Sequence, residues 1–267
     1  MESNTNLWHT IFAEGHPILL GKQKKYQAIG KGPRCKLCKA PFDSHNDLNE
    51  NIAIPSNRNP RFCNLCDDFI RKNPGGCKVI MPIIFVDIKG STSLSDKLEL
   101  MEYVKIINFF YKITTEIFVQ TDGFLIDVIG DEVFSIYPSG FSGIDGDNQN
   151  LRDKQDIAAK KAFVAVSKLL EYSLYANNAP YGKFGICLDI SELYIGTING
   201  AEDGIIDIRV WGRSVNMAAR LCSACEPGEA LITLETALKL GLQISNYTTR
   251  TLKLRGINEP ISAISIK

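Results

Sequence analysis

The sequence predicts an α+β fold with a mostly antiparallel sheet, preceded by a small cysteine-containing module. After residue 77, apolar strand-like runs alternate with helix-like stretches in the order strand, helix, hairpin, helix, hairpin, helix, strand. A Pro-Gly-Gly break at residues 74–76 separates this part from the segment before it. That earlier segment carries two Cys-x-x-Cys pairs among prolines and asparagines, and it could hardly build a core alone.

The spacing of apolar residues predicts each element of the main domain. Strands are expected over 78–87, 182–194 and 205–211, with a hairpin formed by 124–129 and 132–137. Helices are expected over 93–120, 156–175 and 214–224, and residues 138–150 form a Gly/Asp-rich loop. This order fits helices packed on an antiparallel sheet, as in the ferredoxin-like palm.

These signals divide the chain into three segments. Residues 1–30 form an N-terminal segment with expected helical character, 31–76 the cysteine module and 77–267 the main domain. Apolar residues make up 45% of the 267, which is enough for a packed core in the main domain.

The bulk properties argue against nucleic-acid and membrane proteins. The formal net charge is zero, so no broad field for nucleic acid is expected. No apolar stretch approaches the ~20 residues that span a bilayer, and the N-terminus lacks an apolar signal-peptide core. We therefore expect a cytoplasmic protein without membrane insertion, whose eight cysteines are thiols or metal ligands rather than disulfides.

Four cysteines have the spacing of a zinc site. Cys35 and Cys38 form one Cys-x-x-Cys pair, and Cys63 and Cys66 form another after 24 intervening residues. Two such knuckles supply four thiolates, which predicts a tetrahedral structural Zn²⁺ with no open catalytic position. Unliganded thiols and a redox dithiol are the alternatives. The similar spacing at residues 222–225 continues a helical pattern, so metal is not expected there.

Two aspartates lie where apolar strands end beside glycine-containing turns. Asp87 ends the strand over 78–87, and Asp131 lies at the tip of the predicted hairpin. Carboxylates at such positions suit a hard cation that carries a triphosphate. Two of them on adjacent strands can hold two metal ions at one phosphoryl-transfer site. A capping or turn role is the alternative for each aspartate alone.

Four segments, in this order, resemble the catalytic domain of class III nucleotidyl cyclases, the adenylate and guanylate cyclase family. They are FVDIKGST (85–92), IDVIGDEV (126–133), RVWGRSVNMAARL (209–221) and LRGINEP (254–260). The resemblance covers residues 78–267. It implies a phosphorus-oxygen lyase that forms a 3′,5′-cyclic nucleotide and pyrophosphate, as a head-to-tail homodimer with composite active sites.

The resemblance also implies a role for each matching residue. Two Mg²⁺ or Mn²⁺ ions per site would be held by the side chains of Asp87 and Asp131 and the carbonyl of Ile88. Asn216 would orient the ribose, and Arg220 would stabilise charge on the α-phosphate. The remaining matches are expected to bind the triphosphate, and they are Gly90, Ser91, Thr92, Lys183 and Arg255. Lys183 replaces the more usual arginine, which keeps the charge but loses the bidentate geometry.

The two base-reading positions depart from the family pattern. They hold Asp127 and Arg209, whereas adenylate cyclases place Lys at the first and Asp or Thr at the second. Hydrogen bonding to uracil, cytosine or guanine is possible, and the bulk of Arg209 favours a pyrimidine. The chain also resembles the bacterial pyrimidine cyclases of antiphage signalling, so UTP and then CTP are the expected substrates. Alternatively, Asp127 and Arg209 form a salt bridge and other residues read the base.

Three other functions remain open at this point. The first is an adenylate or guanylate cyclase, the second is a catalytically silent nucleotide-binding module that regulates a partner, and the third is an adaptor built on the zinc module. The presence of both aspartates together with Asn216 and Arg220 favours catalysis, because silent modules usually lose one of these residues.

Overall fold

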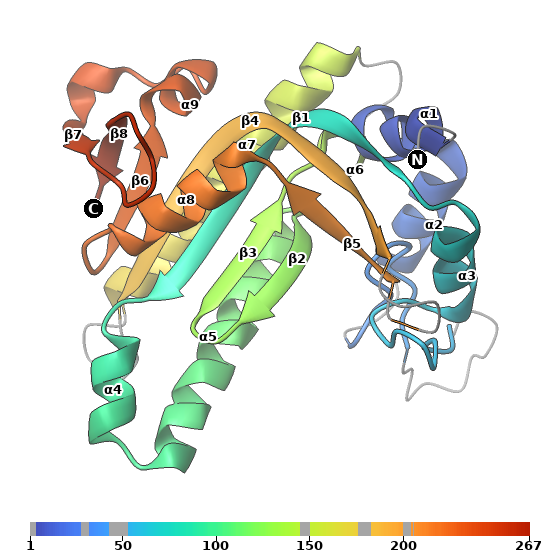
Figure 1. Cartoon of the computed structure of the whole chain (residues 1–267), viewed down its shortest axis with the longest axis horizontal. Coiled ribbons are helices and arrows are strands. Elements are labelled where there is room, and N and C mark those ends of the chain that lie inside the picture. Colours follow the sequence, from blue (N-terminus) through green and yellow to red (C-terminus); the bar gives the residue numbers. More distant parts are fainter. Residues whose placement is uncertain are drawn as a thin grey trace. The chain divides into compact units, whose positions relative to one another are not determined.

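The structure is a computed structural model that describes residues 4–27, 32–42, 53–144, 150–175, 183–199, 204 and 206–267. The chain divides into two compact units. The smaller unit comprises Met1–Val79 and Tyr194–Trp211, and the larger unit comprises Ile80–Leu193 and Gly212–Lys267. Figure 1 labels the elements, of which strands β1 (Gly76–Ile88) and β4 (Phe184–Asn199) pass from one unit into the other.

The strands follow the order β2-β3-β1-β4-β6-β8-β7, and β5 pairs with β4 beside this path. The β4–β6 pair is parallel, whereas the β1–β3, β2–β3, β4–β5, β6–β8 and β7–β8 pairs are antiparallel. The mostly antiparallel sheet expected from the sequence is therefore confirmed. The remaining strands are β2 (Phe124–Ile129), β3 (Glu132–Ile136), β5 (Ile206–Trp211), β6 (Glu229–Thr233), β7 (Thr248–Leu252) and β8 (Ile261–Ile266).

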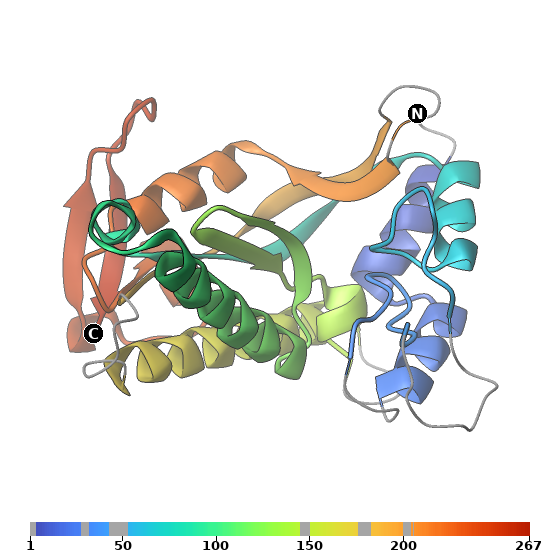
Figure 2. The same cartoon turned by 90° about the horizontal axis from the view of Figure 1, so that it is seen from below.

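Two long helices cover the sheet of the larger unit. Helices α5 (Leu100–Gln120) and α7 (Leu151–Tyr175) run side by side along it, in green and olive in Figure 2. Their apolar faces meet strands β1, β4 and β6 in one buried core. Burying these faces is the main favourable contribution to folding. Further helical elements of this unit are α6 (Ser139–Ser142), α8 (Arg213–Ser223), α9 (Leu234–Lys239) and the 3₁₀ turn Ile244–Asn246.

The helix predicted over 93–120 is in fact two helices, which corrects that expectation. Helix α4 (Ser91–Lys97) ends at Leu98, and Glu99 before α5 is also extended, with φ −60° and ψ 145°. The apolar spacing continues across this break, so the pattern alone does not reveal it. Helix α6 likewise lies inside the segment predicted as a loop, and α7 begins five residues before the predicted start at residue 156.

A buried carboxylate ties the three C-terminal strands together. Glu229 on β6 is inaccessible to solvent and accepts hydrogen bonds from Arg250 on β7 and Ser265 on β8. Burial is the largest single effect and would raise the pKa of Glu229, but the hydrogen bonds from Arg250, the Glu226 amide and Ser265, with the charge of Arg250, together lower the pKa below the usual value. This pair therefore adds stability above about pH 4.5 and loses it as the pH falls through the lowered pKa.

We expect Arg250→Met to lower the free energy of unfolding at pH 7 by about 2–3 kcal/mol, because it leaves a buried charge without its partner. The loss should shrink below about pH 4.5, where Glu229 becomes protonated in the variant. Denaturant unfolding at pH 7 and at pH 4 measures both effects. Arg250→Lys, which keeps the charge, serves as the control. An equal loss at both pH values would contradict this account.

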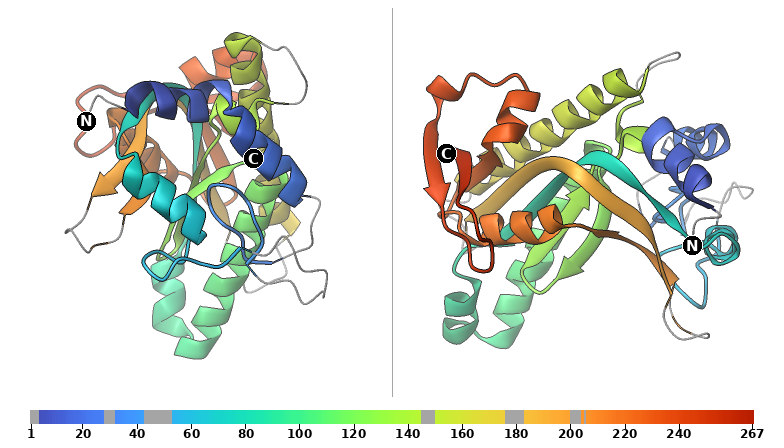
Figure 3. Two further views of the ribbon diagram at one scale, coloured as in Figure 1. Left: turned by 90° about the vertical axis from the view of Figure 1, so that its right-hand side faces the viewer. Right: turned by 45° about the horizontal axis from the view of Figure 1, so that its top comes forward.

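The smaller unit contains the N-terminal helices and the cysteine module. Helix α1 (Thr5–His9) continues into the π-helix Thr10–Glu14, and α2 (Pro17–Gln27) follows, so the expected helical character is confirmed. Figure 3 (left) shows these elements in dark blue and α3 (Asn64–Lys72) in cyan. Trp8 is fully buried, stacks on Phe12 and donates from Nε1 to the carbonyl of Asn73 at 2.9 Å. No helix among the described residues is long and apolar enough to cross a membrane.

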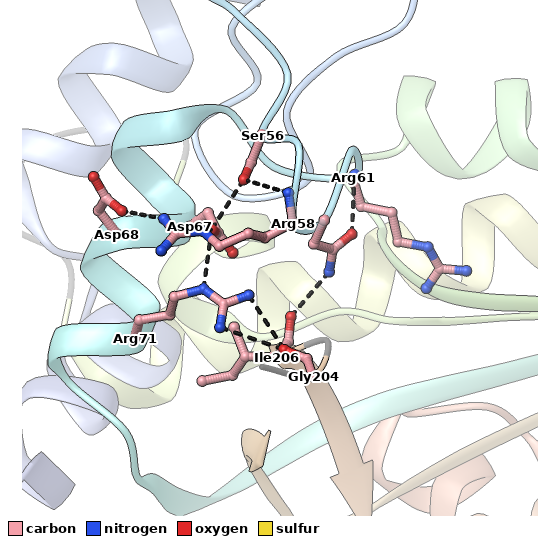
Figure 4. Close-up of polar contacts among 9 residues, drawn as sticks. Ser56, Arg58, Arg61, Asp67, Asp68, Arg71, Gly204 and Ile206 are labelled. Atoms are coloured by element: carbon pink, nitrogen blue, oxygen red, sulfur yellow. Dashed lines mark hydrogen bonds and ion pairs between the residues drawn. The ribbon is translucent and has the colours of Figure 1, made fainter. Parts of the chain in front are cut away.

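Helix α3 begins directly after Cys63 and includes Cys66. The buried Asp67 of this helix accepts a hydrogen bond from Ser56 at 2.9 Å and forms ion pairs with Arg58 and Arg71 (Figure 4). Arg71 also donates to the carbonyl of Gly204, which precedes β5. Asn59 donates to the carbonyl of Ile206 at 2.9 Å. These bonds join the cysteine module to strand β5 within the smaller unit.

Candidate functional site

Backbone pairing brings Asp87 and Asp131 to the same end of the sheet. Asp87 on β1 is paired with Glu132 on β3, the residue that follows Asp131. The amide of Ile88 donates to the carbonyl of Asp131 at 3.2 Å. Gly130 has φ +60°, the left-handed value that a two-residue hairpin turn needs at its first position, and this turn places Asp131 at the hairpin tip. The sequence prediction that both aspartates lie at neighbouring strand ends is confirmed.

The two oxygens of Asp87 have different surroundings. Oδ2 accepts from the ammonium of Lys89 at 3.0 Å. Oδ1 is buried and has no hydrogen-bond partner among the described residues. Burial raises the pKa of Asp87 and the neighbouring Asp131 raises it further, whereas Lys89 opposes the shift. A buried carboxylate oxygen without a partner is a position that a hard cation can fill, so the residues fit a Mg²⁺ or Mn²⁺ ligand.

Asp131 is held by the start of helix α4. Its Oδ2 accepts a hydrogen bond from the hydroxyl of Ser91, the first residue of that helix. Gly90 caps the helix with φ +79°, a conformation that suits glycine. The amide of Lys89 donates to the carbonyl of Lys183 at 2.8 Å, so that N–H group is already used. The amides of Gly90, Ser91 and Thr92, which belong to the residues expected to bind the triphosphate, therefore stay the candidates for phosphate contact.

A third carboxylate, Glu132, lies beside this pair. Burial, reinforced by Asp87 and Asp131, raises the pKa of Glu132 to about 7. Sequence reasoning missed both Glu132 and the side chain of Lys89, although each adjoins a motif residue. The strand pairing could have revealed Glu132. It lies directly opposite Asp87, and residues opposite each other on paired strands share a face of the sheet.

Helix α8 presents Asn216 and Arg220 to one pocket, as their spacing of four residues predicts. The pocket has a volume of about 400 Å³ and is lined by Arg213, Asn216, Arg220, Gly256, Ile257, Asn258 and Glu259. Arg220 donates to the carbonyl of Arg255, which fixes its guanidinium against the turn between β7 and β8. Neither Asp87 nor Asp131 is among the described residues that line this pocket.

The other two predicted phosphate ligands, Lys183 and Arg255, lie in different places. Lys183 directly precedes β4, and its carbonyl bonds to Lys89 beside Asp87. Arg255 is exposed in the turn beside Arg220. The structure therefore places the backbone of Lys183 beside that of Lys89, and the carbonyl of Arg255 against Arg220. Their binding of phosphate stays a prediction.

The predicted base-reading residues belong to different units. Asp127 on β2 in the larger unit is buried, and its Oδ1 accepts from the amide of Val128 at 3.0 Å. Arg209 on β5 in the smaller unit pairs through Nε with Oδ2 of Asp207 at 3.3 Å. Buried Asp207 also binds Lys36 at 3.3 Å and Arg61 at 3.1 Å. Since Lys36 follows Cys35 in the chain, this carboxylate connects the cysteine module to Arg209.

The four predicted zinc ligands converge. The sulfur atoms of Cys35, Cys38, Cys63 and Cys66 all lie within 4.8 Å of one another, and all four residues are buried. Cys38 and Cys63 are 3.8 Å apart at Sγ, about the separation that ~2.3 Å bonds to a tetrahedral zinc require. The amide of Cys63 donates to Sγ of Cys35 at 3.3 Å, which stabilises a thiolate. The donor set therefore fits Zn²⁺.

Comparison with known proteins identifies relatives of the larger part of the chain. Residues 79–262 match the model of the adenylate and guanylate cyclase catalytic domain. An uncharacterized protein of Mycobacterium tuberculosis (strain CDC 1551 / Oshkosh) is 27% identical over 192 residues, 68% of this chain and 31% of that protein. The terminal-differentiation-specific adenylate cyclase of Dictyostelium discoideum is 24% identical over 71% of this chain and 9% of its own length. The chain thus spans about a third or less of these relatives.

Solved structures share the fold. The crystal structure of the guanylyl cyclase Cya2 gives a TM-score of 0.57 at 21% identity, covering 72% of this chain and 93% of that one. The adenylyl cyclase CyaB from P. aeruginosa gives 0.55 at 22% identity, covering 72% and 96%. This likeness confirms the predicted α+β architecture of helices on a mixed, mostly antiparallel sheet.

Proposed function

Because the chain belongs to the family of adenylate and guanylate cyclase catalytic domains, we propose that it converts a nucleoside triphosphate into a 3′,5′-cyclic nucleotide and pyrophosphate. The observation that carries the proposal is the pair of strand-end carboxylates, one with a buried, unpartnered oxygen. In this reaction the ribose 3′-oxygen bonds to the α-phosphorus, the bond to the pyrophosphate oxygen breaks, and the 3′-hydroxyl loses its proton.

Asp87, Asp131 and the carbonyl of Ile88 would hold two Mg²⁺ or Mn²⁺ ions. When bound, such ions neutralise the triphosphate and lower the pKa of the 3′-hydroxyl. The amides of Gly90, Ser91 and Thr92 and the side chains of Lys183 and Arg255 would bind the phosphates. Asn216 would orient the ribose, and Arg220 would offset charge that develops on the α-phosphate.

We propose that the active form is a homodimer with composite sites. Within one chain, the carboxylates and the pocket of Asn216 and Arg220 are separate features of the larger unit. A site that needs both sets is completed if one chain supplies the carboxylates and its neighbour supplies helix α8. Monomers would then be inactive.

For the base we propose a pyrimidine, UTP before CTP, and a role in antiphage signalling. The proposal is supported by the identities of Asp127 and Arg209 and by the bulk of the arginine. Nε of Arg209 lies 3.3 Å from Oδ2 of Asp207, and this ion pair restricts the movement of the guanidinium that would contact the base. Uracil offers O4 as an acceptor for Arg209 and N3–H as a donor to Asp127.

Nucleotide competition tests this function. The protein is incubated with equal amounts of ATP, GTP, CTP and UTP and with Mn²⁺, and the cyclic products are separated by mass spectrometry. We expect cyclic UMP to dominate, with cyclic CMP second. Arg209→Ala should change the ranking of the four products more than the Mn²⁺ requirement. Mainly cyclic AMP or GMP would overturn the pyrimidine proposal, and unchanged nucleotides would overturn catalysis.

A further inference from the structure

The ammonium of Lys89 has three acceptors. It donates to Oδ2 of Asp87 at 3.0 Å, to the carbonyl of Cys222 at 2.6 Å and to the carbonyl of Ser223 at 3.0 Å. An ammonium carries three N–H donors, so these bonds use all of them. Lys89 therefore connects a carboxylate of the candidate metal site to the C-terminal end of helix α8.

The backbone is shaped to hold this side chain. A Cβ atom added to Gly185 on β4 would lie 2.0 Å from Cε of Lys89 and 2.8 Å from its Nζ. The same atom would lie 2.6 Å from Oδ1 of Asp87, so any larger residue would disturb the pair. The amide of Lys89 is fixed to the carbonyl of Lys183 at 2.8 Å. The lysine thus crosses β4 where only a glycine leaves room for it.

The pair is also poorly hydrated. The side chain of Lys89 is 11% exposed and that of Asp87 is 15% exposed. Charges interact more strongly at such a position than at an open surface. The ammonium therefore compensates the negative charge of Asp87 in the same place where a divalent cation would do so.

We propose that Lys89 is a built-in counter-cation of Asp87, which a divalent ion bound at Oδ1 must push away from Oδ2 because the two positive charges repel each other. This inference rests on the proposed metal site and goes beyond it. Displacement breaks the bond to Asp87 and leaves the ammonium held only by the carbonyls of Cys222 and Ser223 at the end of helix α8. Metal binding at Asp87 is then transmitted to the helix that carries Asn216 and Arg220.

The test is Mn²⁺ binding to the zinc-loaded full chain, followed through the electron paramagnetic resonance signal of free Mn²⁺. Lys89→Met removes the competing charge, so we expect Mn²⁺ to bind about tenfold more tightly than to wild type. Lys89→Gln, which also removes the charge but keeps a polar side chain, should show the same direction. It provides the measurement if the Met variant does not fold.

Thermal unfolding supplies a second readout that does not involve turnover. Without Mn²⁺ the Lys89 variants should have a lower Tm than wild type, by about 5 °C, because Asp87 loses its counter-ion. Saturating Mn²⁺ should close that gap. Lys161→Met removes a comparable ion pair, Lys161 with Asp122 at 2.7 Å, and should leave the Mn²⁺ affinity at the wild-type value.

The outcomes separate this inference from the proposed function. Mn²⁺ that binds the Lys89 variants as weakly as wild type, or more weakly, would overturn the displacement of Lys89 while leaving the metal site in place. No saturable Mn²⁺ binding to any form would overturn both the metal site and the inference. If Mn²⁺ also bound the Lys161 variant more tightly than wild type, the effect would be a general one of net charge, and the displacement of Lys89 would be overturned.

Discussion

Asp87→Asn should reduce cyclic nucleotide formation by at least about 1000-fold. The substitution keeps the shape of the side chain but removes the charge, and Oδ1 is the buried oxygen that has no hydrogen-bond partner in the described part of the chain. An amide is a poor ligand for a hard divalent ion in place of a carboxylate. Product formation from UTP with Mn²⁺, measured by mass spectrometry, gives the rate, and Mn²⁺ binding gives the cause.

Asp122→Asn is the matched control. Asp122 is also a carboxylate of the larger unit paired with a lysine, and it has φ +61°, which asparagine tolerates. This variant should turn over at close to the wild-type rate. Wild-type turnover by Asp87→Asn would refute the assignment of Asp87 as a metal ligand.

Mixing variants extends this prediction to the dimer. Asp87→Asn and Asn216→Ala chains should each be inactive alone, and mixtures should regain part of the wild-type activity. One of the two sites in a mixed dimer then combines the intact carboxylates of one chain with the intact helix α8 of the other. Mixed dimers that form, as shown by differently tagged chains, and remain inactive would argue against composite sites.

Removing zinc should have the second large effect. Apparent free energies of structural zinc binding are about 10–16 kcal/mol, so the module should lose its ordered structure without the metal. We expect Cys63→Ser, or chelation of the wild-type protein, to make residues 32–72 sensitive to protease. Zinc analysis should find one ion per wild-type chain and none in the variant.

Cys77→Ser is the control for the zinc experiment. Cys77 is buried on β1 and does not belong to the four-cysteine cluster, so this variant should keep its zinc. A Cys63→Ser protein with wild-type zinc content and protease resistance would contradict the zinc assignment. Iron in place of zinc would correct the metal but leave the four-thiolate site intact.

The features predicted correctly from sequence are those set by local geometry. The apolar run before Asp87 and the hairpin around Gly130 are local patterns that put each carboxylate near a strand end, and the pairing of β1 with β3 then brings the two ends together. Helical periodicity puts Asn216 and Arg220 on one face, and both line one pocket. The two cysteines of each Cys-x-x-Cys pair are close because they are neighbours in the chain, whereas the meeting of the two pairs depends on the fold.

What sequence reasoning missed depends on long-range contacts. Lys89 meets the carbonyl of Cys222, 133 positions along the chain, and no local pattern encodes that contact. The break between α4 and α5 follows from backbone angles at Leu98 and Glu99, while the apolar spacing runs on through it. The grouping of residues 194–211 with the N-terminal segment also arises only in the folded chain.

The ion cluster around Asp207 has a consequence for how this protein can change over generations. One buried carboxylate is shared by Lys36, Arg61 and Arg209, so replacing Arg209 still leaves it two cationic partners. A substitution at position 209 should therefore cost little stability, because no buried charge is stranded. Drift at that position is buffered by its neighbours, so the base-reading role that we propose for Arg209 can change among descendants while the scaffold stays intact.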